Sequence, residues 1–207
     1  NILFSILLIL LLAPHQLNAG TSANVSYESE YIFRGIAQEK SSASAGLDYS
    51  SNGFYAGTWA AQVTEGLEVD GFFGYSGSDE SGDFTYNLGF TGYYYTDDFD
   101  DTYEEINLGF CYSSFCLDGA FGDYENFDGP TLDYTFVSAS YAFENGLYVT
   151  YGDFSQDAAG SYIEFGYGFT VAELDATIKY ISSDSTLVGP SGDNFLILSL
   201  GKGFSFE

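Results

Sequence analysis

The chain has 207 residues, 19% of them aromatic, and 30 acidic against four basic residues give it a formal net charge of -26. So few Lys and Arg residues exclude a binding surface for DNA, RNA or anionic lipid headgroups, because those ligands need clustered basic side chains. Disordered acidic chains are poor in aromatic residues, so this composition predicts a folded chain. Its Tyr, Phe, Thr and Val residues favour strands, and its length favours one domain.

The N-terminal segment predicts export. Residues 2–13 form an apolar run that Pro14 interrupts, and Leu17-Asn18-Ala19 fits the small-residue cleavage pattern of a secretory signal. The run is shorter than the roughly 20 residues that a membrane-spanning helix needs, which disfavours the alternative of a permanent anchor. We therefore expect a signal peptide over 1–19, cleaved after Ala19, and a single domain over 20–207. Residues 1–19 carry no charged side chain, so the domain carries the whole net charge.

Apolar and polar residues alternate with a period of two along almost all of this domain, which is typical of strands with one apolar face. The first strand sets an apolar face of Val25, Tyr27, Ser29, Tyr31 and Phe33 against a polar face of Ser26, Glu28, Glu30, Ile32 and Arg34. The same split recurs over 43–50, 67–75, 84–91, 105–112, 163–170 and 174–180.

Clusters of Gly, Asn, Asp and Ser separate the strands. They cover 35–42, 51–53, 64–66, 76–83, 97–101, 113–114, 124–132, 144–146, 155–160, 172–173 and 183–193. Eleven connections predict twelve strands, or one strand per about 16 residues, which suits a tilted membrane strand of 9–11 residues plus a connection. From residue 97 longer and shorter connections alternate, as in outer-membrane barrels. The early connections break this rule, so about 10 to 14 strands fit the pattern.

Alternation alone does not separate a soluble barrel, which buries its apolar face, from a membrane barrel, which turns that face to lipid. The apolar face is rich in Tyr and Phe near the strand ends, as aromatic girdles at the membrane surface require. The last strand alternates Leu196, Leu198, Leu200, Phe204 and Phe206. A terminal strand closing on Phe favours an outer-membrane barrel inserted by the barrel-assembly machinery through Phe206, with lipid and lipopolysaccharide around it. The alternative is a soluble exported β-barrel.

One stretch of the sequence resembles a known family. Residues Ser29-Glu30-Tyr31-Ile32-Phe33-Arg34-Gly35-Ile36-Ala37-Gln38, followed by Gly46-Leu47-Asp48-Tyr49 and Gly53-Phe54-Tyr55-Ala56-Gly57-Thr58-Trp59-Ala60, resemble the N-terminal signature of the TorF family of Gram-negative outer-membrane porins. The match is specific over residues 25–63, and the chain departs from the pattern at Ala61-Gln62, in its cysteines and in Glu207. The resemblance implies a barrel that lets small solutes through. The motif positions are Tyr31, Phe33, Arg34, Gly35, Gln38, Gly53, Tyr55, Gly57 and Trp59.

The residues argue against an enzyme. The one histidine, His15, lies in the expected signal segment, which excludes a Ser-His-Asp hydrolase and a His-ligated zinc site in the domain. Two carboxylate pairs, Glu28 with Glu30 and Glu68 with Asp70, have a glycosidase-like spacing of about 7 Å along a strand. A polar lumen lining explains both pairs better. We expect no catalytic residues and no cofactor.

Cys111 and Cys116 flank a predicted two-residue turn at Ser113-Ser114. Such a turn places the two cysteines directly opposite each other, where a cross-strand disulfide fits. A redox switch or a metal site is the weaker alternative, because two ligands rarely suffice for a metal.

Strand parity directs an acidic set of side chains into the barrel. Its members are Glu28, Glu30, Asp48, Glu68, Asp70, Glu105, Asp118, Glu164 and Asp175, opposed by Arg34 and Lys179. Nine acids minus two bases leave seven net negative charges, which attract cations and repel anions. Arg34 is expected to form a salt bridge near the channel mouth, with a structural and a gating role equally open.

Acidic loops offer oxygen ligands for divalent cations. The first cluster holds Asp97, Asp98, Asp100 and Asp101, and the second holds Asp123, Glu125 and Asp128. Weak divalent binding that bridges to lipopolysaccharide is one interpretation, and loops that simply stay solvated are the better one. No EF-hand spacing is present.

Together these features predict an all-β, antiparallel transmembrane barrel of about twelve strands in the Gram-negative outer membrane. The predicted function is a passive channel for small hydrophilic solutes that prefers cations. Inward Tyr93, Tyr95 and Phe195 could plug a barrel of this size, so a non-conducting structural or adhesive barrel is the first alternative. A soluble exported barrel that binds an apolar ligand is the second. The sequence leaves the solute and the oligomeric state open.

Overall fold

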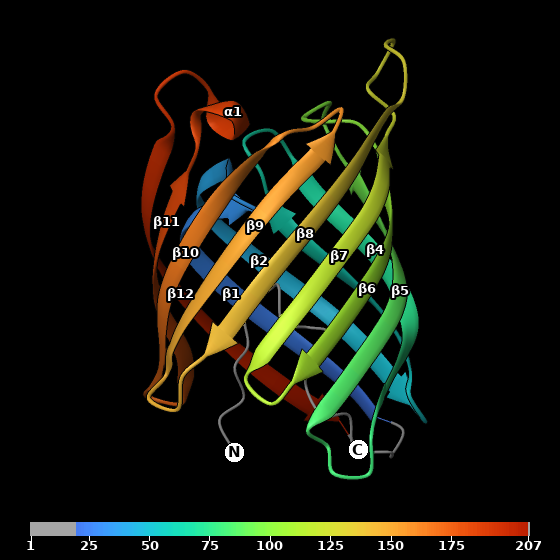
Figure 1. The fold of residues 1–207 in the computed structure, drawn as a ribbon, viewed down its shortest axis with the longest axis vertical. Coiled ribbons are helices and arrows are strands. Elements are labelled where there is room, and N and C mark those ends of the chain that lie inside the picture. The colour runs from blue at the N-terminus through green and yellow to red at the C-terminus, as the bar shows by residue number, and fades with distance from the viewer. Residues whose placement is uncertain (1–19, 207) are drawn as a thin grey trace.

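A computed structural model describes residues 20–206, which form a closed barrel of twelve antiparallel strands (Figure 1). Each strand pairs with its neighbours in the chain, and β1 closes the barrel against β12. The predicted antiparallel barrel of twelve strands is therefore confirmed. Among these residues no helix is long and apolar enough to span a membrane. The predicted signal segment lies outside the described residues.

The strands are 9 to 16 residues long. They are β1 (Gly20–Phe33), β2 (Ile36–Ser51), β3 (Phe54–Gln62), β4 (Leu67–Ser78), β5 (Phe84–Tyr95), β6 (Tyr103–Tyr112), β7 (Phe115–Tyr124), β8 (Leu132–Ala142), β9 (Leu147–Gln156), β10 (Gly160–Val171), β11 (Leu174–Ser183) and β12 (Asp193–Phe206). One short helix, α1 (Ser185–Val188), interrupts the connection between β11 and β12.

The two ends of the barrel differ. The end where β1 begins and β12 finishes also carries the connections at 52–53, 79–83, 113–114, 143–146 and 172–173, which are all short (Figure 1). The opposite end carries the connections at 63–66, 96–102, 125–131, 157–159 and 184–192. In outer-membrane barrels short turns face the periplasm and long loops face outward. The early connections still break this rule, because those at 34–35 and 63–66 are shorter than the one at 79–83 at the other end.

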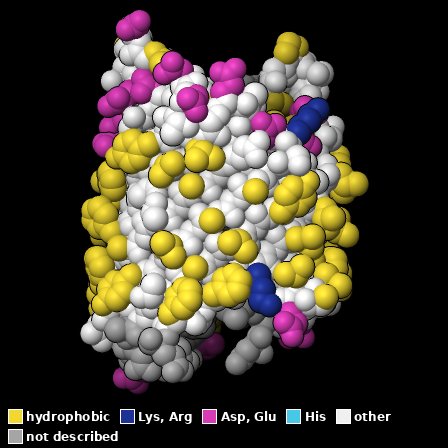
Figure 2. All heavy atoms as spheres, turned by 180° about the vertical axis from the view of Figure 1, so that it is seen from behind, with side chains coloured by type: hydrophobic (Ala, Val, Ile, Leu, Met, Phe, Trp, Pro, Cys, Tyr) yellow, Lys and Arg dark blue, Asp and Glu magenta, His cyan; other side chains and the backbone are white. Residues whose placement is uncertain are grey.

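The outer wall is apolar and the ends are acidic. Alternate strand residues present large exposed hydrophobic side chains, and Leu47, Leu88 and Ile106 are each more than half exposed. Figure 2 shows such side chains spread over the wall, with acidic side chains gathered mainly at the two ends. A soluble protein rarely exposes an apolar surface of this extent. The direction of the alternation is therefore the one that a barrel in lipid requires.

The predicted connection over 35–42 is wrong. The chain reverses at Arg34 and Gly35, whose φ angles are +47° and +84°, and β2 already begins at Ile36. Both residues of a two-residue hairpin turn of this kind need positive φ, and Gly provides it without strain. The polar residues that follow, which resemble a loop in composition, lie on a strand that pairs with β1.

The end of the β1–β2 hairpin leaves the wall. β1 pairs with β12 only from Thr21 to Glu28, and β2 pairs with β3 only from Ser44 to Ser51. Residues 29–42, here called the hairpin tip, have ladder partners only within the hairpin. The ladder within it shifts register between Tyr31 and Ile32, and both side chains are buried. The prediction that Tyr31 continues the outer face of Val25 and Tyr27 is therefore wrong, because the tip folds into the barrel.

Candidate functional site in the barrel interior

The hairpin tip is joined to the far wall by a buried ion pair. The Arg34 guanidinium donates from Nη1 to Glu105 Oε1 and from Nη2 to Glu105 Oε2, the second over 3.0 Å. Glu105, on β6, also accepts hydrogen bonds from Tyr134 Oη at 2.7 Å, Asn107 Nδ2 at 2.9 Å and Tyr93 Oη at 3.0 Å. A buried charge is tolerated only when it is paired and its remaining lone pairs are bonded, and this carboxylate meets both conditions.

Aromatic rings enclose the same guanidinium. Its Cζ lies 4.4 Å from the ring centroid of Phe136 on β8 and 4.8 Å from that of Phe33 in the hairpin tip. Cations are attracted to aromatic faces at this range, most strongly where water is excluded. Arg34 therefore lies inside the barrel among groups from β1, β6 and β8.

Gly35 lies against the wall formed by β10 and β11. Its carbonyl oxygen accepts a hydrogen bond of 2.7 Å from Ser183 Oγ on β11. A Cβ at Gly35 would lie only 2.8 Å from Cβ of Tyr162 on β10. A residue with any side chain would force these elements apart, so the docked turn requires glycine for space as well as for its positive φ.

Tyr31 fixes the other side of the tip. Its hydroxyl donates to Glu68 Oε1 on β4 at 2.8 Å, and its ring meets Trp59 of β3 edge-on at 5.8 Å between centroids. Two side-chain bonds to backbone oxygens add to this contact, from Ser42 Oγ to Gln62 at 2.7 Å and from Thr64 Oγ1 to Gln38 at 2.9 Å.

The interior at the level of the tip is filled. Ile32 packs into a buried cluster built from the inner faces of β7 to β12, and its other members are Ala120, Tyr134, Phe136, Phe154, Tyr162, Ile181, Phe195 and Ile197. Tyr93 and Phe195 are buried inward side chains, and the Tyr95 ring meets Phe99 at a tilt and Tyr103 edge-on. In this conformation the hairpin tip and the cluster occupy the interior of the barrel.

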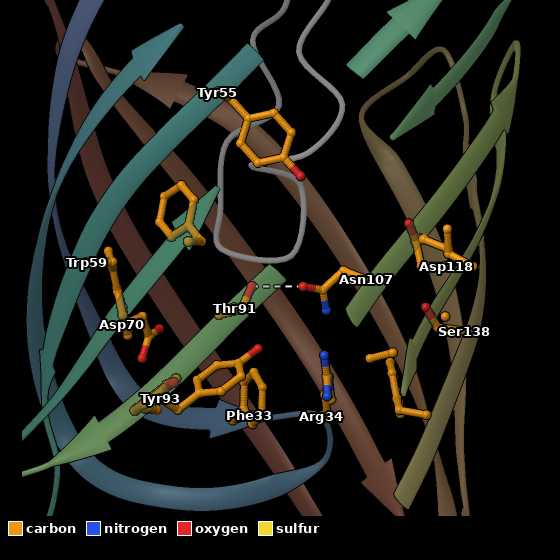
Figure 3. Close-up of a pocket in the computed structure, with 16 residues that line it drawn as sticks. Phe33, Arg34, Tyr55, Trp59, Asp70, Thr91, Tyr93, Asn107, Asp118 and Ser138 are labelled. Atoms are coloured by element: carbon orange, nitrogen blue, oxygen red, sulfur yellow. Dashed lines mark hydrogen bonds between the residues drawn. The ribbon is translucent and has the colours of Figure 1, made fainter. Parts of the chain in front are cut away.

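A cavity of about 130 Å³ lies beside the tip (Figure 3). Aromatic side chains of β3, β4, β5 and β8 line it together with Asp70, Asp118 and Asn107. Several polar atoms at its wall are buried without a hydrogen-bond partner among the described residues, namely Trp59 Nε1, Asp70 Oδ1, Ser138 Oγ and Arg34 Nε. A polar cavity of this size holds water or a small solute.

A second interior ion pair lies in the wall rather than at the tip. Lys179 Nζ of β11 donates to Glu28 Oε1 of β1 at 3.0 Å, and Ser199 Oγ of β12 donates to the same oxygen at 2.7 Å. These three residues are on neighbouring strands within the continuous ladder. The pair therefore holds the closure of the barrel and does not depend on the tip.

The remaining predicted lumen residues occupy several environments. Glu164 accepts a 2.6 Å bond from Tyr148 Oη, and Asp48 lies 3.4 Å from Asn24 Nδ2. Asp175 and Asp118 are half-buried on inner faces, and Glu30 lies in the tip opposite Lys40. None of the three ion pairs among residues 20–206 includes Asp70 or Asp118.

The motif residues of β3 also belong to the interior. Gly53 turns the chain into β3 with φ of +87°. Tyr55 and Trp59 are buried, and a Cβ at Gly74 or Gly89 would come within 2.4 Å of the Tyr55 hydroxyl. The glycines of β4 and β5 thus leave the space that this ring fills. Sequence reasoning did not identify Tyr134, Phe136 or Ser183. Ser183 lies in step with the inward Asp175 and Lys179, whereas Tyr134 and Phe136 are apolar and alternation does not direct them inward.

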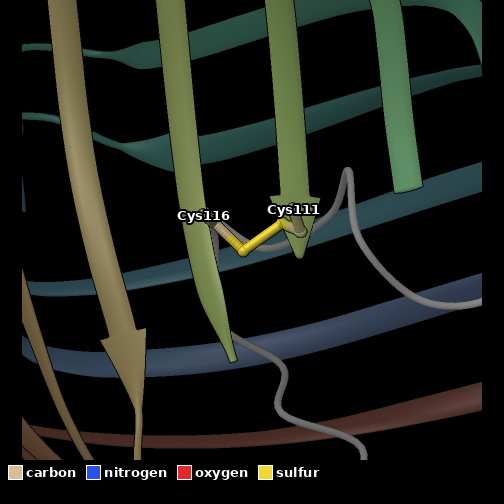
Figure 4. The surroundings of a disulfide bond; sticks show 2 residues. All are labelled: Cys111 and Cys116. Atoms are coloured by element: carbon tan, nitrogen blue, oxygen red, sulfur yellow. A yellow bond between two sulfur atoms is a disulfide. The ribbon is translucent and has the colours of Figure 1, made fainter. Parts of the chain in front are cut away.

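Cys111 and Cys116 are joined by a disulfide across the β6–β7 turn, with their Cα atoms 4.1 Å apart (Figure 4). They are direct ladder partners, and the turn between them is Ser113–Ser114. The bond lies at the short-turn end, away from the hairpin tip, and no described cysteine is free.

The carboxylates of the acidic loop between β5 and β6 accept hydrogen bonds from nearby groups of the protein. Asp100 accepts hydrogen bonds from Tyr124 Oη at 2.7 Å and Tyr103 Oη at 2.9 Å, and Asp101 accepts one from the Phe127 amide at 2.5 Å. Within residues 20–206 no three His, Cys, Asp or Glu side chains are grouped so that they could hold a metal ion. These contacts order the loops at the outer end.

Comparison with known proteins identifies the family. The model of a family described as "Bacterial protein of unknown function (Gcw_chp)" matches residues 13–194, and the chain belongs to that family. No curated protein is similar in sequence. The fold is similar to that of the KdgM porin, with a TM-score of 0.58, 9% identity and coverage of 90% of this chain and 99% of that one.

Two further structures show the same fold. One is described as "KdgM porin in complex with disordered oligogalacturonate", with a TM-score of 0.58, 10% identity and coverage of 90% and 99% of the two chains. The other comes from work described as "Unveiling the Mechanism Behind the in-meso Crystallization of Membrane Proteins", with a TM-score of 0.60, 12% identity and coverage of 91% and 84%. At these identities the likeness concerns the barrel alone.

Proposed function

We propose that this member of the Gcw_chp family is a porin-like passive channel of the Gram-negative outer membrane that passes small hydrophilic solutes and prefers cations. The observation that supports this function best is the sidedness of the barrel. Its wall exposes large apolar side chains, while buried carboxylates and hydroxyls line its interior. A barrel needs a polar interior to pass hydrophilic solutes and an apolar exterior to reside in lipid. The resemblance to TorF porins over residues 25–63 points the same way.

The proposed cation preference follows from the pairing of the interior charges. The two interior cations are neutralised, Arg34 by Glu105 and Lys179 by Glu28. Asp70 and Asp118 line the cavity without an ion-pair partner, and the half-buried Asp118, which water reaches, is the one that can carry a charge. A low-dielectric wall focuses the field of such carboxylates onto the path, which concentrates cations and repels anions.

The same proposal includes export and assembly. A signal peptide cleaved after Ala19 would deliver the chain to the periplasm, and the barrel-assembly machinery would insert it through the strand that ends in Phe206. Lipid and lipopolysaccharide would then surround the wall. We propose no catalytic role, because residues 20–207 contain no histidine to act as a general base or metal ligand.

The cation preference is tested by reversal potentials in planar bilayers that contain many channels under a salt gradient. We expect the wild type to reverse on the cation-selective side and Asp70→Asn/Asp118→Asn to reverse closer to zero. Glu104→Gln is the matched control, because it removes a carboxylate from an exposed position on β6. An unchanged reversal potential in the double variant, or an equal shift in the control, would contradict the assignment of selectivity to the cavity.

One observation favours a second candidate, a non-conducting structural barrel. The hairpin tip and the buried cluster occupy the interior of the barrel in this conformation. Protein that is inserted and folded but carries no ions, even when the tip is displaced, would support that candidate. The channel and the structural barrel therefore differ in whether the hairpin tip can be displaced.

A further inference from the structure

The wall of the barrel carries an unused edge next to the hairpin tip. β12 pairs with β11 from Asp193 to Gly201, but it pairs with β1 only from Ser199 onward. The segment of β12 from Asp193 to Leu198 therefore has no ladder partner on its β1 side among the described strands. An unpaired strand edge is a ready template for another strand.

The tip already touches the first position of that edge. The backbone N–H of Leu198 donates to Ser29 Oγ at 2.9 Å, in place of the next ladder bond. Continuing the β1–β12 ladder in register beyond Glu28 and Ser199 would place Ser29 opposite Leu198, Tyr31 opposite Leu196 and Phe33 opposite Asn194. No insertion or register shift between the two strands is needed.

The sequence pattern fits this extended ladder better than it fits the interior position that the tip occupies in the structure. Alternation along residues 25–33 puts Ser29, Tyr31 and Phe33 on the same outer face as Val25 and Tyr27. In the interior position the ladder within the hairpin shifts at Tyr31/Ile32, and Tyr31 turns inward instead. Regular alternation is what a strand in the wall of a membrane barrel requires.

The exposure of β12 agrees with this interpretation. Leu196 is 71% exposed, more than any other large hydrophobic side chain among residues 20–206. It lies on the outer face of the unused edge, and its in-register partner would be Tyr31. Cross-strand pairs between aromatic and aliphatic side chains stabilise a sheet, so docking Tyr31 beside Leu196 would cover an otherwise bare position.

We propose that the hairpin tip is the gate of the channel and alternates between two docked positions. In the closed position, seen here, it lies inside the barrel and Arg34 binds Glu105. In the open position β1 continues its ladder along β12, so that Tyr31 and Phe33 turn to the outer face and the turn at Arg34 and Gly35 moves away from Glu105 to the end of the wall. The role of the tip as a gate depends on the proposed channel function. The existence of the two docked positions does not depend on it.

Each position has its own set of interactions. Closing forms the Arg34–Glu105 pair and the bonds from Tyr31 to Glu68 and from Ser183 to Gly35. Opening exchanges these side-chain bonds for backbone ladder bonds along the free edge of β12. The hairpin carries its own internal ladder in both positions, so it can move as a unit about the points where β1 leaves β12 and β2 leaves β3.

A cross-link tests the open position. Tyr31→Cys/Leu196→Cys places two thiols at positions that are opposite each other only when the ladder is extended. We expect the disulfide to form on mild oxidation of the protein in lipid vesicles, and reduction to reverse it. The matched control is Tyr31→Cys/Leu88→Cys, which pairs the same tip residue with an exposed leucine of the outer wall on β5. Failure of the first pair to cross-link, or equal cross-linking of the control, would overturn the two-position model.

Conductance then tests the gate. We expect the Tyr31–Leu196 cross-link to hold the channel open and reduction to restore closures. Glu105→Gln should raise the cross-linking yield in the same background about tenfold, because it removes a charge-assisted bond of the closed position. Glu173→Gln, which breaks the exposed Lys202–Glu173 ion pair in the turn between β10 and β11, should leave the yield unchanged.

The outcomes separate the gate from the channel. A cross-linked protein whose conductance equals that of the reduced, conducting protein would overturn the gate. A cross-link that forms in a barrel that never conducts, oxidised or reduced, would contradict the channel while leaving the two docked positions in place.

Discussion

Arg34 and Glu105 are 71 residues apart in the chain and form the central ion pair of the barrel interior. Arg34 occupies a two-residue turn with a φ of +47°, and Glu105 lies on the inner face of β6. The pair is bidentate and both side chains are almost fully buried. Taking two charges out of water is costly, and their mutual attraction offsets that cost only when both are present. The turn is therefore stable in the interior only while both Arg34 and Glu105 remain.

A double-mutant cycle should show this coupling. We expect Arg34→Asn or Glu105→Gln alone to lower the free energy of unfolding by about 3 kcal/mol, because each leaves an uncompensated buried partner. Asn tolerates the positive φ of the turn, which limits the effect to the lost pair. The double variant should lose clearly less than the sum. Urea unfolding in lipid vesicles measures this, and strict additivity would show that the two residues are not coupled.

Gly35→Ala should weaken docking of the hairpin tip. The added Cβ would lie 2.8 Å from Tyr162 Cβ, at a backbone φ of +84° that alanine rarely adopts. We expect a loss of about 1 to 3 kcal/mol in unfolding experiments and a larger fraction of time in the conducting state. Gly71→Ala is the control, since a Cβ there meets nothing within 4 Å. Equal effects of the two substitutions would contradict the close contact.

The Cys111–Cys116 disulfide should contribute little to stability. It closes a short loop, with a sequence separation of 5, that the β6–β7 hairpin already closes. Chain entropy then limits its contribution to about 2 kcal/mol. Cys111→Ser/Cys116→Ser should still fold into a barrel that migrates faster on a gel when unheated than when boiled. Mass spectrometry of the alkylated wild type should find no free thiol, and a barrel that fails to form without the bond would contradict this estimate.

The loop between β11 and β12 should show an unusually acidic carboxyl group. Asp184 caps α1, and hydrogen bonds from the Leu187 amide, the Ser161 side chain and the Ser161 and Thr186 amides lower its pKa below the usual aspartate value. A carboxyl with a depressed pKa stabilises the fold above its unfolded pKa, and this contribution is lost as the pH falls through its folded pKa. The Leu187 amide chemical shift in detergent micelles should therefore titrate below about pH 3.9.

Asp184→Asn provides the control for that titration, since Asn also caps helices but does not ionise. The low-pH transition of the Leu187 amide should disappear in this variant. A midpoint at or above the usual aspartate value in the wild type would contradict the capping interaction as the cause.

The sequence predicts the wall of the barrel well and its interior poorly. Period-two alternation and turn composition depend on neighbouring residues only, so they identify the strands, their outer faces and the Cys111–Cys116 register. The fate of residues 29–42 depends on contacts with β4, β6, β8, β10 and β11, which no local pattern contains. Alternation therefore assigns Tyr31 to the outer face, and the polar composition after Gly35 predicts a loop.

The charged residues likewise include some that the sequence places correctly and some that it does not. Strand parity directed Glu105 and Lys179 inward, and they lie there. Parity also directs Arg34 inward. In the structure Arg34 reaches the interior on the turn between β1 and β2 rather than on a strand of the wall. Spacing in the sequence does not identify its partner on β6. The signal available in the sequence is a two-residue turn of Arg34 and Gly35 preceded by Tyr31 and Phe33, and it becomes interpretable only once the contacts with the opposite wall are known.

Single-channel recording of the refolded wild-type protein in a planar bilayer under a salt gradient tests the central claim most directly. The account predicts discrete transitions between a closed and a conducting level, with a reversal potential on the cation-selective side. Silence from protein shown to be folded and inserted, or steps that reverse on the anion-selective side, would contradict it.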